Sequence, residues 1–281
     1  MPTFPTPDGV LVTVNLPVGD LLIIASDRSD TEVVPHGLDD PSSLRVRYED
    51  RRLVVDGPPA RNSWTSWLGF GESIQVRIDV PEGATVNGVV LEGGLRGVGR
   101  LGECTFRTDC GEIALDRTGP LKLTTDSGDI SVKEITGHAE VTSDSGVVQI
   151  RRIDGSAGIT SEYGETEIGE VTGDLRLHGR DADLLIGRTH GVVDAYSDSG
   201  DIRVAEVVGG SVSAASDSGN IEISLPEDAD AVLDLRAPKG TVHDSPREGR
   251  ADNSLGRSIA VQAQSHSGDV SITRFKPKPF H

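Results

Sequence analysis

The sequence contains few aromatic residues and no long apolar run. Phe, Trp and Tyr make up 4% of its 281 residues, so a thick aromatic core is not expected. No stretch of eighteen consecutive apolar residues occurs, which excludes a transmembrane helix. The interior must instead be built from Val, Ile, Leu and Ala, and thin layers of β-sheet suit these side chains.

Cysteine and basic residues are also scarce. Cys104 and Cys110 are the only cysteines, which argues against a secreted, disulfide-stabilised fold. The 27 Lys and Arg residues are outnumbered by 45 Asp and Glu residues, which gives a net charge of −18. This balance argues against binding to a nucleic-acid backbone and favours cationic partners. The first residues lack the basic and apolar runs of a signal peptide. We therefore expect a cytoplasmic protein that binds neither nucleic acid nor membranes.

Sequence motifs of catalysis are absent as well. There is no Gly-x-Ser-x-Gly elbow, phosphate loop or dinucleotide fingerprint, and the histidines do not have metal-ligand spacing. Two carboxylates can hydrolyse a glycosidic bond, but in so acidic a chain neighbouring carboxylates are expected by chance. The sequence thus predicts no enzymatic activity and no cofactor.

Glycine, in contrast, is abundant, with 34 residues, and it is arranged as a repeat. One series has steps of 17, 18, 18, 18, 18 and 19 residues, with an alanine at one position: Gly111, Gly128, Gly146, Gly164, Ala182, Gly200 and Gly219. A second series lies between its members: Gly102, Gly119, Gly137, Gly155, Gly173, Gly191 and Gly209. A repeat this short holds one supersecondary unit, which must stack on its neighbours to bury an apolar face.

The apolar residues fall into columns when the chain is written in rows of eighteen. Val132, Ile150 and Ile168 share one such column, and within each row apolar residues alternate with polar ones. Alternation is typical of a strand with one buried face, and stacked strands lie about 4.8 Å apart. An outward column alternates in charge, which favours a single register: Arg117, Glu134, Arg152, Glu170, Arg188 and Glu206. The pattern predicts an all-β fold, a single-stranded parallel β-helix (β-solenoid) with about 18 residues per coil.

Two regions depart from this period. Residues 1–92 contain strand-like runs without it, and we interpret them as an irregular β-strand cap that precedes the β-helix of residues 93–281. Near the other end, residues 243–256 have the composition of a loop. The turn Ser265–Asp269 is expected to close the final coil, and the proline-containing tail after Lys276 to block the sheet edge.

Acidic residues recur on both sides of the glycine turn. Like charges stacked at strand spacing repel, and calcium favours oxygen-rich loops of this kind. The candidate calcium ligands are Asp126, Asp129, Asp144, Asp198, Asp201 and Asp217. The alternative, which we favour, is that Asp and Ser serve the turns through local hydrogen bonds.

One aromatic segment stands out in residues 62–71. It contains Trp64, Trp67 and Phe70, residue types that are enriched at interfaces. These three side chains are therefore candidates for contact with a partner. The alternative, which we favour, is that the segment covers an open end of the solenoid.

The repeated Ser-Asp-Ser-Gly-(Asp/Asn)-Ile block resembles the bacterial "putative adhesin" family of β-strand-repeat proteins, a domain of unknown function. The opening Pro2-Thr3-Phe4, the stretch Gly99–Cys104 and the stretch Ile168–Leu175 support the resemblance, which covers essentially the whole chain. It implies a parallel β-helix, for which we prefer the right-handed form. It implies no established activity and no catalytic residue.

Three functions are compatible with these observations. The first is a non-enzymatic structural or interaction scaffold, a monomer or small homo-oligomer that binds an unknown protein partner. The second is a surface or carbohydrate-binding adhesin. The third is an acidic mimic of nucleic acid that binds a basic partner, which only the net charge of −18 supports.

Overall fold

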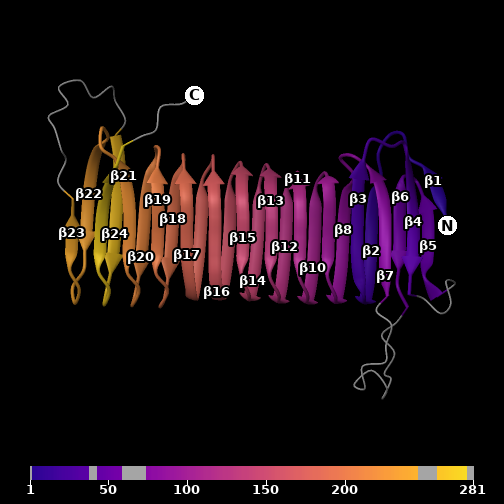
Figure 1. Cartoon of the computed structure of the whole chain (residues 1–281), viewed down its shortest axis with the longest axis horizontal. Coiled ribbons are helices and arrows are strands. Elements are labelled where there is room, and N and C mark those ends of the chain that lie inside the picture. The colour runs from indigo at the N-terminus through magenta and orange to yellow at the C-terminus, as the bar shows by residue number, and fades with distance from the viewer. Residues whose placement is uncertain (1, 38–42, 59–73, 246–257, 277–281) are drawn as a thin grey trace, which may run out of the picture. The chain divides into compact units, whose positions relative to one another are not determined.

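The computed structural model is all-β, and most of its strand pairs are parallel (Figure 1). It describes residues 2–37, 43–58, 74–245 and 258–276. The chain forms two compact units, Met1–His138 and Ala139–His281, and each is considered by itself below. No described segment forms a helix long and apolar enough to cross a membrane.

The described residues of the first unit form thirteen short strands. They are β1 (Thr3–Pro5), β2 (Leu11–Val18), β3 (Asp20–Ser26), β4 (Asp30–His36), β5 (Arg45–Glu49), β6 (Arg52–Asp56), β7 (Gln75–Pro81), β8 (Thr85–Glu92), β9 (Leu95–Arg100), β10 (Cys104–Cys110), β11 (Ile113–Thr118), β12 (Leu121–Ser127) and β13 (Ile130–Thr136). Two successive strands joined by a glycine turn, such as β12 and β13, are called a rung here.

Rungs of the first unit stack in parallel with a sequence step of 17 or 18 residues. Cys104 lies opposite Val86 on one side and Leu121 on the other. Ile113 lies in the same way between Leu95 and Ile130. All six of these inward side chains are buried. The step is already present at β8, within residues 1–92.

The beginning of the chain is placed inside this stack. Val12 of β2 is opposite Val86 of β8 on one side and Leu53 of β6 on the other. β3 lies likewise between β9 and β7. Antiparallel strands complete this end of the unit, since β5 pairs with β6, β4 with β7 and β1 with β4.

Twelve strands are formed by the part of the second unit that the structure describes. They are β14 (Ala139–Ser145), β15 (Val148–Asp154), β16 (Ala157–Val171), β17 (Leu175–Thr189), β18 (Val192–Ser197), β19 (Ile202–Val207), β20 (Ser211–Ser216), β21 (Ile221–Pro226), β22 (Asp230–Arg236), β23 (Val242–Asp244), β24 (Ser258–Ser265) and β25 (Val270–Phe275). The described pairs between them are all parallel.

The predicted register is confirmed in this unit. Ile150 is opposite Ile168, which is opposite Ile186, and all three are buried. The polar column follows the same register, because Arg152 is opposite Glu170 and Glu170 is opposite Arg188. Positions eighteen residues apart are therefore spatial neighbours, as the sequence pattern indicated.

The last strands of the chain, β24 and β25, are also placed inside a stack, which corrects one prediction. Val261 of β24 is opposite Val212 of β20 on one side and Leu233 of β22 on the other. β25 lies likewise between β21 and β23. The turn Ser265–Asp269 therefore does not close the final rung, because β22 and β23 lie beyond it. The strand before the proline-containing tail, β25, is thus an internal strand. The tail itself, from residue 277 onward, lies outside the described residues, so its predicted role as an edge blocker stays a prediction.

The predicted loop at residues 243–256 begins too early. His243 and Asp244 belong to β23, which pairs with β25. The rest of the predicted loop, from residue 246 onward, lies outside the described residues.

Candidate interaction surface

The first serine of each late turn is buried and holds two rungs together. The hydroxyl of Ser197 accepts a hydrogen bond from the N–H of Gly200 at 2.9 Å. It donates to the carbonyl of Ala182, on the preceding rung, at 3.1 Å. Ser216 and Ser265 repeat both bonds in their own turns. The recurring serine thus satisfies buried backbone groups that would otherwise have no partner.

The residue after the turn glycine also links successive rungs. Asp183 Oδ1 accepts the N–H of Asp201 at 2.9 Å, and Asp201 Oδ1 accepts the N–H of Asn220 at 2.7 Å. Asn220 Oδ1 then accepts the N–H of Asp269 at 3.0 Å. Asp269 Oδ1 accepts the N–H of Thr241 at 2.7 Å and its hydroxyl at 2.6 Å, and the hydroxyl bond lowers the pKa of Asp269. These four residues form the carboxylate–amide ladder.

One of the six candidate calcium ligands, Asp201, belongs to this ladder. Its Oδ1 already accepts a hydrogen bond from the backbone N–H of Asn220 on the next rung. The remaining candidates, Asp126, Asp129, Asp144, Asp198 and Asp217, lie at or beside turns. Within the described residues, no group of three or more His, Cys, Asp or Glu side chains is placed to hold a metal ion.

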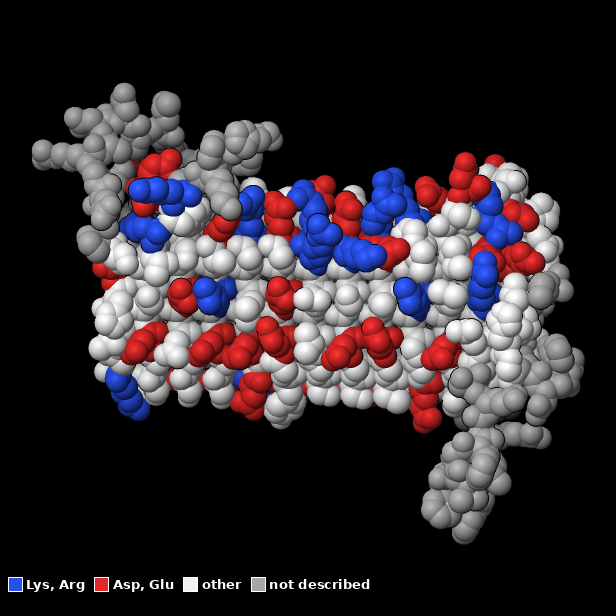
Figure 2. Space-filling model, in the orientation of Figure 1, with Lys and Arg blue, Asp and Glu red and all other residues white. Residues whose placement is uncertain are grey.

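Outward charges are partly paired along the sheet. Arg152 is hydrogen-bonded to Glu170, and Arg188 Nε donates to Glu206 at 2.7 Å. The second partner of Glu170 is His190, whose Nε2 lies 2.9 Å from Glu170 Oε1, rather than Arg188. In the second unit, at the left of Figure 2, Asp and Glu side chains also gather in a row across successive strands. This row is a candidate contact surface for a cationic partner.

An aromatic group on the outward face of the second unit was not anticipated from the sequence. The rings of His178 and Tyr196 are stacked with centroids 5.3 Å apart, because the two residues are opposite each other on β17 and β18. Tyr163 is 46% exposed, and Arg180 Nη1 donates to its hydroxyl at 3.5 Å and to Glu162 at 3.2 Å. The eighteen-residue spacing of His178 and Tyr196 was the signal that could have revealed the stack.

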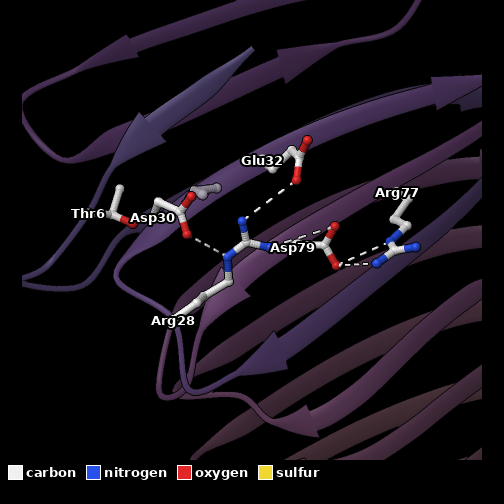
Figure 3. A network of polar contacts seen from close by, with 7 residues as sticks. Thr6, Arg28, Asp30, Glu32, Arg77 and Asp79 are labelled. Atoms are coloured by element: carbon white, nitrogen blue, oxygen red, sulfur yellow. Dashed lines mark hydrogen bonds and ion pairs between the residues drawn. The ribbon is translucent and has the colours of Figure 1, made fainter. Parts of the chain in front are cut away.

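A network of charged side chains lies in the N-terminal part of the first unit (Figure 3). Asp79 of β7 is 5% exposed and lies between Arg28 and Arg77. Arg77 Nη2 is 2.9 Å from Asp79 Oδ1, and Arg28 Nη1 is 3.8 Å from Asp79 Oδ2. Arg28 Nε also donates to Asp30 at 2.8 Å, which lowers the pKa of Asp30 and raises that of Arg28. Each acid has a basic partner, so the network ties β4 and β7 together.

The outward face of the first unit contains a groove of about 460 Å³. Its apolar lining includes Leu22 and Ile24 of β3, Val98 of β9 and Ala114 of β11, all partly exposed. They come together because the strands pair in parallel, with Ile24 opposite Val98. Outward positions of a one-face-buried strand are ordinarily polar, so an apolar cluster here is a candidate contact surface.

A bulge and acidic side chains border this groove. β9 carries one residue more than β11 between the aligned pairs, and Gly99 in the bulge has φ 87°. Its N–H donates to Asp116 Oδ2 at 3.2 Å, and Lys133 Nζ lies 2.6 Å from Asp116 Oδ1. The hydrogen bond from Lys133 lowers the pKa of Asp116. Asp20 and Glu112 line the groove with one basic residue, Arg96.

Two sets of predicted residues remain to be placed. Trp64, Trp67 and Phe70 lie outside the described residues. Both cysteines are free, with Cys104 buried and Cys110 exposed. Burial raises the pKa of the Cys104 thiol to about 12, so this side chain stays a neutral, small apolar group.

Comparison with known proteins places the chain in a family. A family model described as Toastrack DUF4097 matches residues 13–258. The chain belongs to this family. Membership in the Toastrack family agrees with the resemblance drawn from the Ser-Asp-Ser-Gly turns. A domain of unknown function brings no catalytic residue with it, and no curated protein matches this Toastrack chain.

Solved structures similar to this Toastrack protein are distant in sequence. A "putative adhesin" from Bacteroides fragilis is 13% identical, with 96% of this chain and 95% of that chain covered and a TM-score of 0.38. A "putative adhesin" from Parabacteroides merdae is 15% identical, with coverages of 96% and 94% and a TM-score of 0.36. A "putative lipid binding protein" from Parabacteroides distasonis is 11% identical, with coverages of 96% and 95% and a TM-score of 0.41.

Proposed function

We propose that this Toastrack protein is a non-enzymatic interaction scaffold whose groove in the first unit binds a protein partner. The outward apolar cluster of Leu22, Ile24 and Val98 is the observation that carries this proposal. The partner's contacting segment is apolar, to fill the groove, and basic, to meet Asp20 and Glu112. The net charge of −18 favours the same choice of partner.

Two variants test this assignment. Ile24→Asp combined with Val98→Asp places charges in the groove, whereas Ser131→Asp adds a charge on the neighbouring β13 outside it. A synthetic peptide of alternating Leu and Lys serves as the probe, with binding followed by fluorescence anisotropy. We expect the groove variant to bind at least about tenfold more weakly, which corresponds to about 1.4 kcal/mol. Equal binding by both variants would contradict the proposal.

The proposed architecture behind this function is a rigid parallel β-helix. It has about 18 residues per coil, a right-handed path and an irregular β cap in residues 1–92. The steps of 17 and 18 residues between Val86, Cys104 and Leu121 support it. A rigid sheet keeps the groove pre-formed, which lowers the entropy lost on binding.

A carbohydrate-binding, adhesin-like role is the second candidate. It is favoured by the exposed Tyr163 and by the stacked His178 and Tyr196, because aromatic rings beside hydrogen-bonding groups suit sugar recognition. Tyr163→Ser with Tyr196→Ser should then abolish binding to a glycan array, and an array that is blank for the wild type removes this candidate. The acidic nucleic-acid mimic rests on charge alone and would be recognised by competition with DNA for a basic protein.

We propose a cytoplasmic location for the scaffold. Free thiols at Cys104 and Cys110 are typical of a reducing compartment. Cell fractionation tests this, and recovery in the envelope fraction would instead favour the adhesin-like role.

A further inference from the structure

β22 is an edge strand within the described part of the second unit. It pairs with β24 on one side, and no described strand pairs with its other side. Its inward residue Leu233 is opposite the buried Val261 but is itself only half-buried. The outward Val232 is 69% exposed. A strand edge that no described strand pairs, and that carries exposed apolar side chains, is a template for pairing with another strand.

The sequence of β22 is complementary to itself when read in reverse. If two copies run antiparallel with Leu233 opposite Leu233, then Asp230 lies opposite Arg236 at both ends of the pair. Ala231 then lies opposite Leu235, so the inward residues of both copies meet on one face. Opposite charges facing each other across strands are stabilising, and like charges are destabilising.

Neighbouring registers lack this match. Moving the centre of the pair to Val232 sets Asp230 opposite Asp234, and moving it to Asp234 sets that carboxylate opposite its own copy. Both arrangements bring like charges together at an edge. The register centred on Leu235 also sets Asp234 opposite Arg236, but it aligns only three residues of β22 with β22. The register centred on Leu233 aligns all seven residues and combines an apolar centre with two cross-strand ion pairs.

We propose that this Toastrack protein forms a closed dimer through antiparallel pairing of β22 with β22 of a second copy. The backbone groups of the two edges satisfy each other, and Leu233 of each copy covers the half-buried Leu233 of the other. Because both copies use the same edge, the contact is two-fold symmetric and stops at two chains instead of growing into a filament.

Charge reversal tests the proposal. Asp230→Arg and Arg236→Asp each bring like charges together in the dimer, whereas the double variant restores both pairs with the signs exchanged. Size-exclusion chromatography with light scattering, over a dilution series, should show a dimer for the wild type and the double variant. Each single variant should dissociate at an at least about tenfold higher concentration, since two ion pairs are lost per dimer.

Folding and the other occupants of the edge are controlled in the same experiment. Arg236 Nη2 lies 2.9 Å from Asp234 Oδ2 in its own chain, so circular dichroism melts must show that Arg236→Asp remains folded. A wild-type monomer at all concentrations means that the edge is covered by the chain itself and overturns the proposal. Oligomers that grow with concentration mean head-to-tail stacking and overturn it too, as does a double variant that stays monomeric.

Disulfide trapping reports the register independently of stability. In a Cys110→Ser background, Leu233→Cys should form an intermolecular disulfide, because opposite residues have Cβ atoms about 4.5–5.5 Å apart. Val232→Cys is the matched control, since Val232 lies opposite Asp234 of the other copy and not opposite itself. A mixture of Val232→Cys and Asp234→Cys chains should cross-link. Efficient cross-linking of Val232→Cys alone would disprove this register.

Discussion

Asp201 and Asn220 are joined by a hydrogen bond from the backbone N–H of Asn220 to Asp201 Oδ1, with a length of 2.7 Å. The two residues are on adjacent rungs, so the carboxylate acts across the stack. Local hydrogen bonds within each turn were predicted for the aspartates, whereas this bond of Asp201 connects two successive turns. The carboxylate–amide ladder thereby joins the glycine turns of the late rungs.

Asp201→Ala removes one step of this ladder. We expect the free energy of unfolding to fall by about 1 kcal/mol, because a charge-assisted bond at a solvent-exposed site is lost. Asp217→Ala is the matched control, since this exposed turn carboxylate is not part of the ladder. Urea unfolding measures both, and equal losses would show that the ladder adds nothing specific.

Calcium should not stabilise the protein specifically. The six candidate aspartates are not gathered into a metal site within the described residues. Calcium and magnesium should therefore shift the melting temperature equally at the same ionic strength, through screening of the −18 net charge. A larger shift with calcium alone would restore the acidic turns as ligands.

Ser216→Ala should lower the free energy of unfolding more than Asp201→Ala does. The Ser216 hydroxyl is buried, accepts the N–H of Gly219 at 2.8 Å and donates to the carbonyl of Gly200 at 3.2 Å. Its removal leaves two buried backbone groups without a partner, so we expect a loss of about 2 kcal/mol in unfolding free energy. Ser218→Ala, on the exposed side of the same turn, should change it by less than about 0.5 kcal/mol.

The sequence predicted the regular part of the fold because one physical pattern controls it. Val148, Thr166 and Leu184 are adjacent in space since a two-residue alternation and an eighteen-residue step fix both face and register. A single inserted residue is harder to see. The step from Val193 to Val212 is nineteen residues, and the glycine stacked on Gly191 is Gly210, not the predicted Gly209.

Spatial order at the chain ends could not be predicted from spacing. Gly268 stacks directly on Gly219, and Gly240 stacks on Gly268, so the order in space differs from the order in sequence. Periodicity reports which residues face inward but not which rung is nearest. The groove could not be predicted for a related reason. Ile24 and Val98 are far apart in sequence, and only the pairing of β3 with β9 brings them together.

Lowering the pH should reduce the stability of the folded first unit, because the carboxylate of Asp116 becomes protonated. Its pKa is lowered by the hydrogen bond from Lys133, so the folded state binds fewer protons than the unfolded state. The resulting stabilisation is present above the ordinary Asp value of 3.8 and is lost as the pH falls through the lowered value. The melting temperature of Asp116→Asn should therefore lie below that of the wild type at neutral pH, and the gap should shrink below pH 3.8. A gap that stays constant with pH would show that Asp116 contributes only through packing.

Close approach of the backbones accounts for the glycine column in the late rungs. A Cβ on Gly200 would lie 1.9 Å from the carbonyl oxygen of Ala182, a distance that requires the rungs to separate. Gly200→Ala should therefore lower the free energy of unfolding by at least about 2 kcal/mol. Gly158→Ala is the control, because no atom lies within 4 Å of its added Cβ, and it should leave stability unchanged or slightly raised. If both variants unfold at the same urea concentration, the spacing between rungs is set by something other than contact at this column.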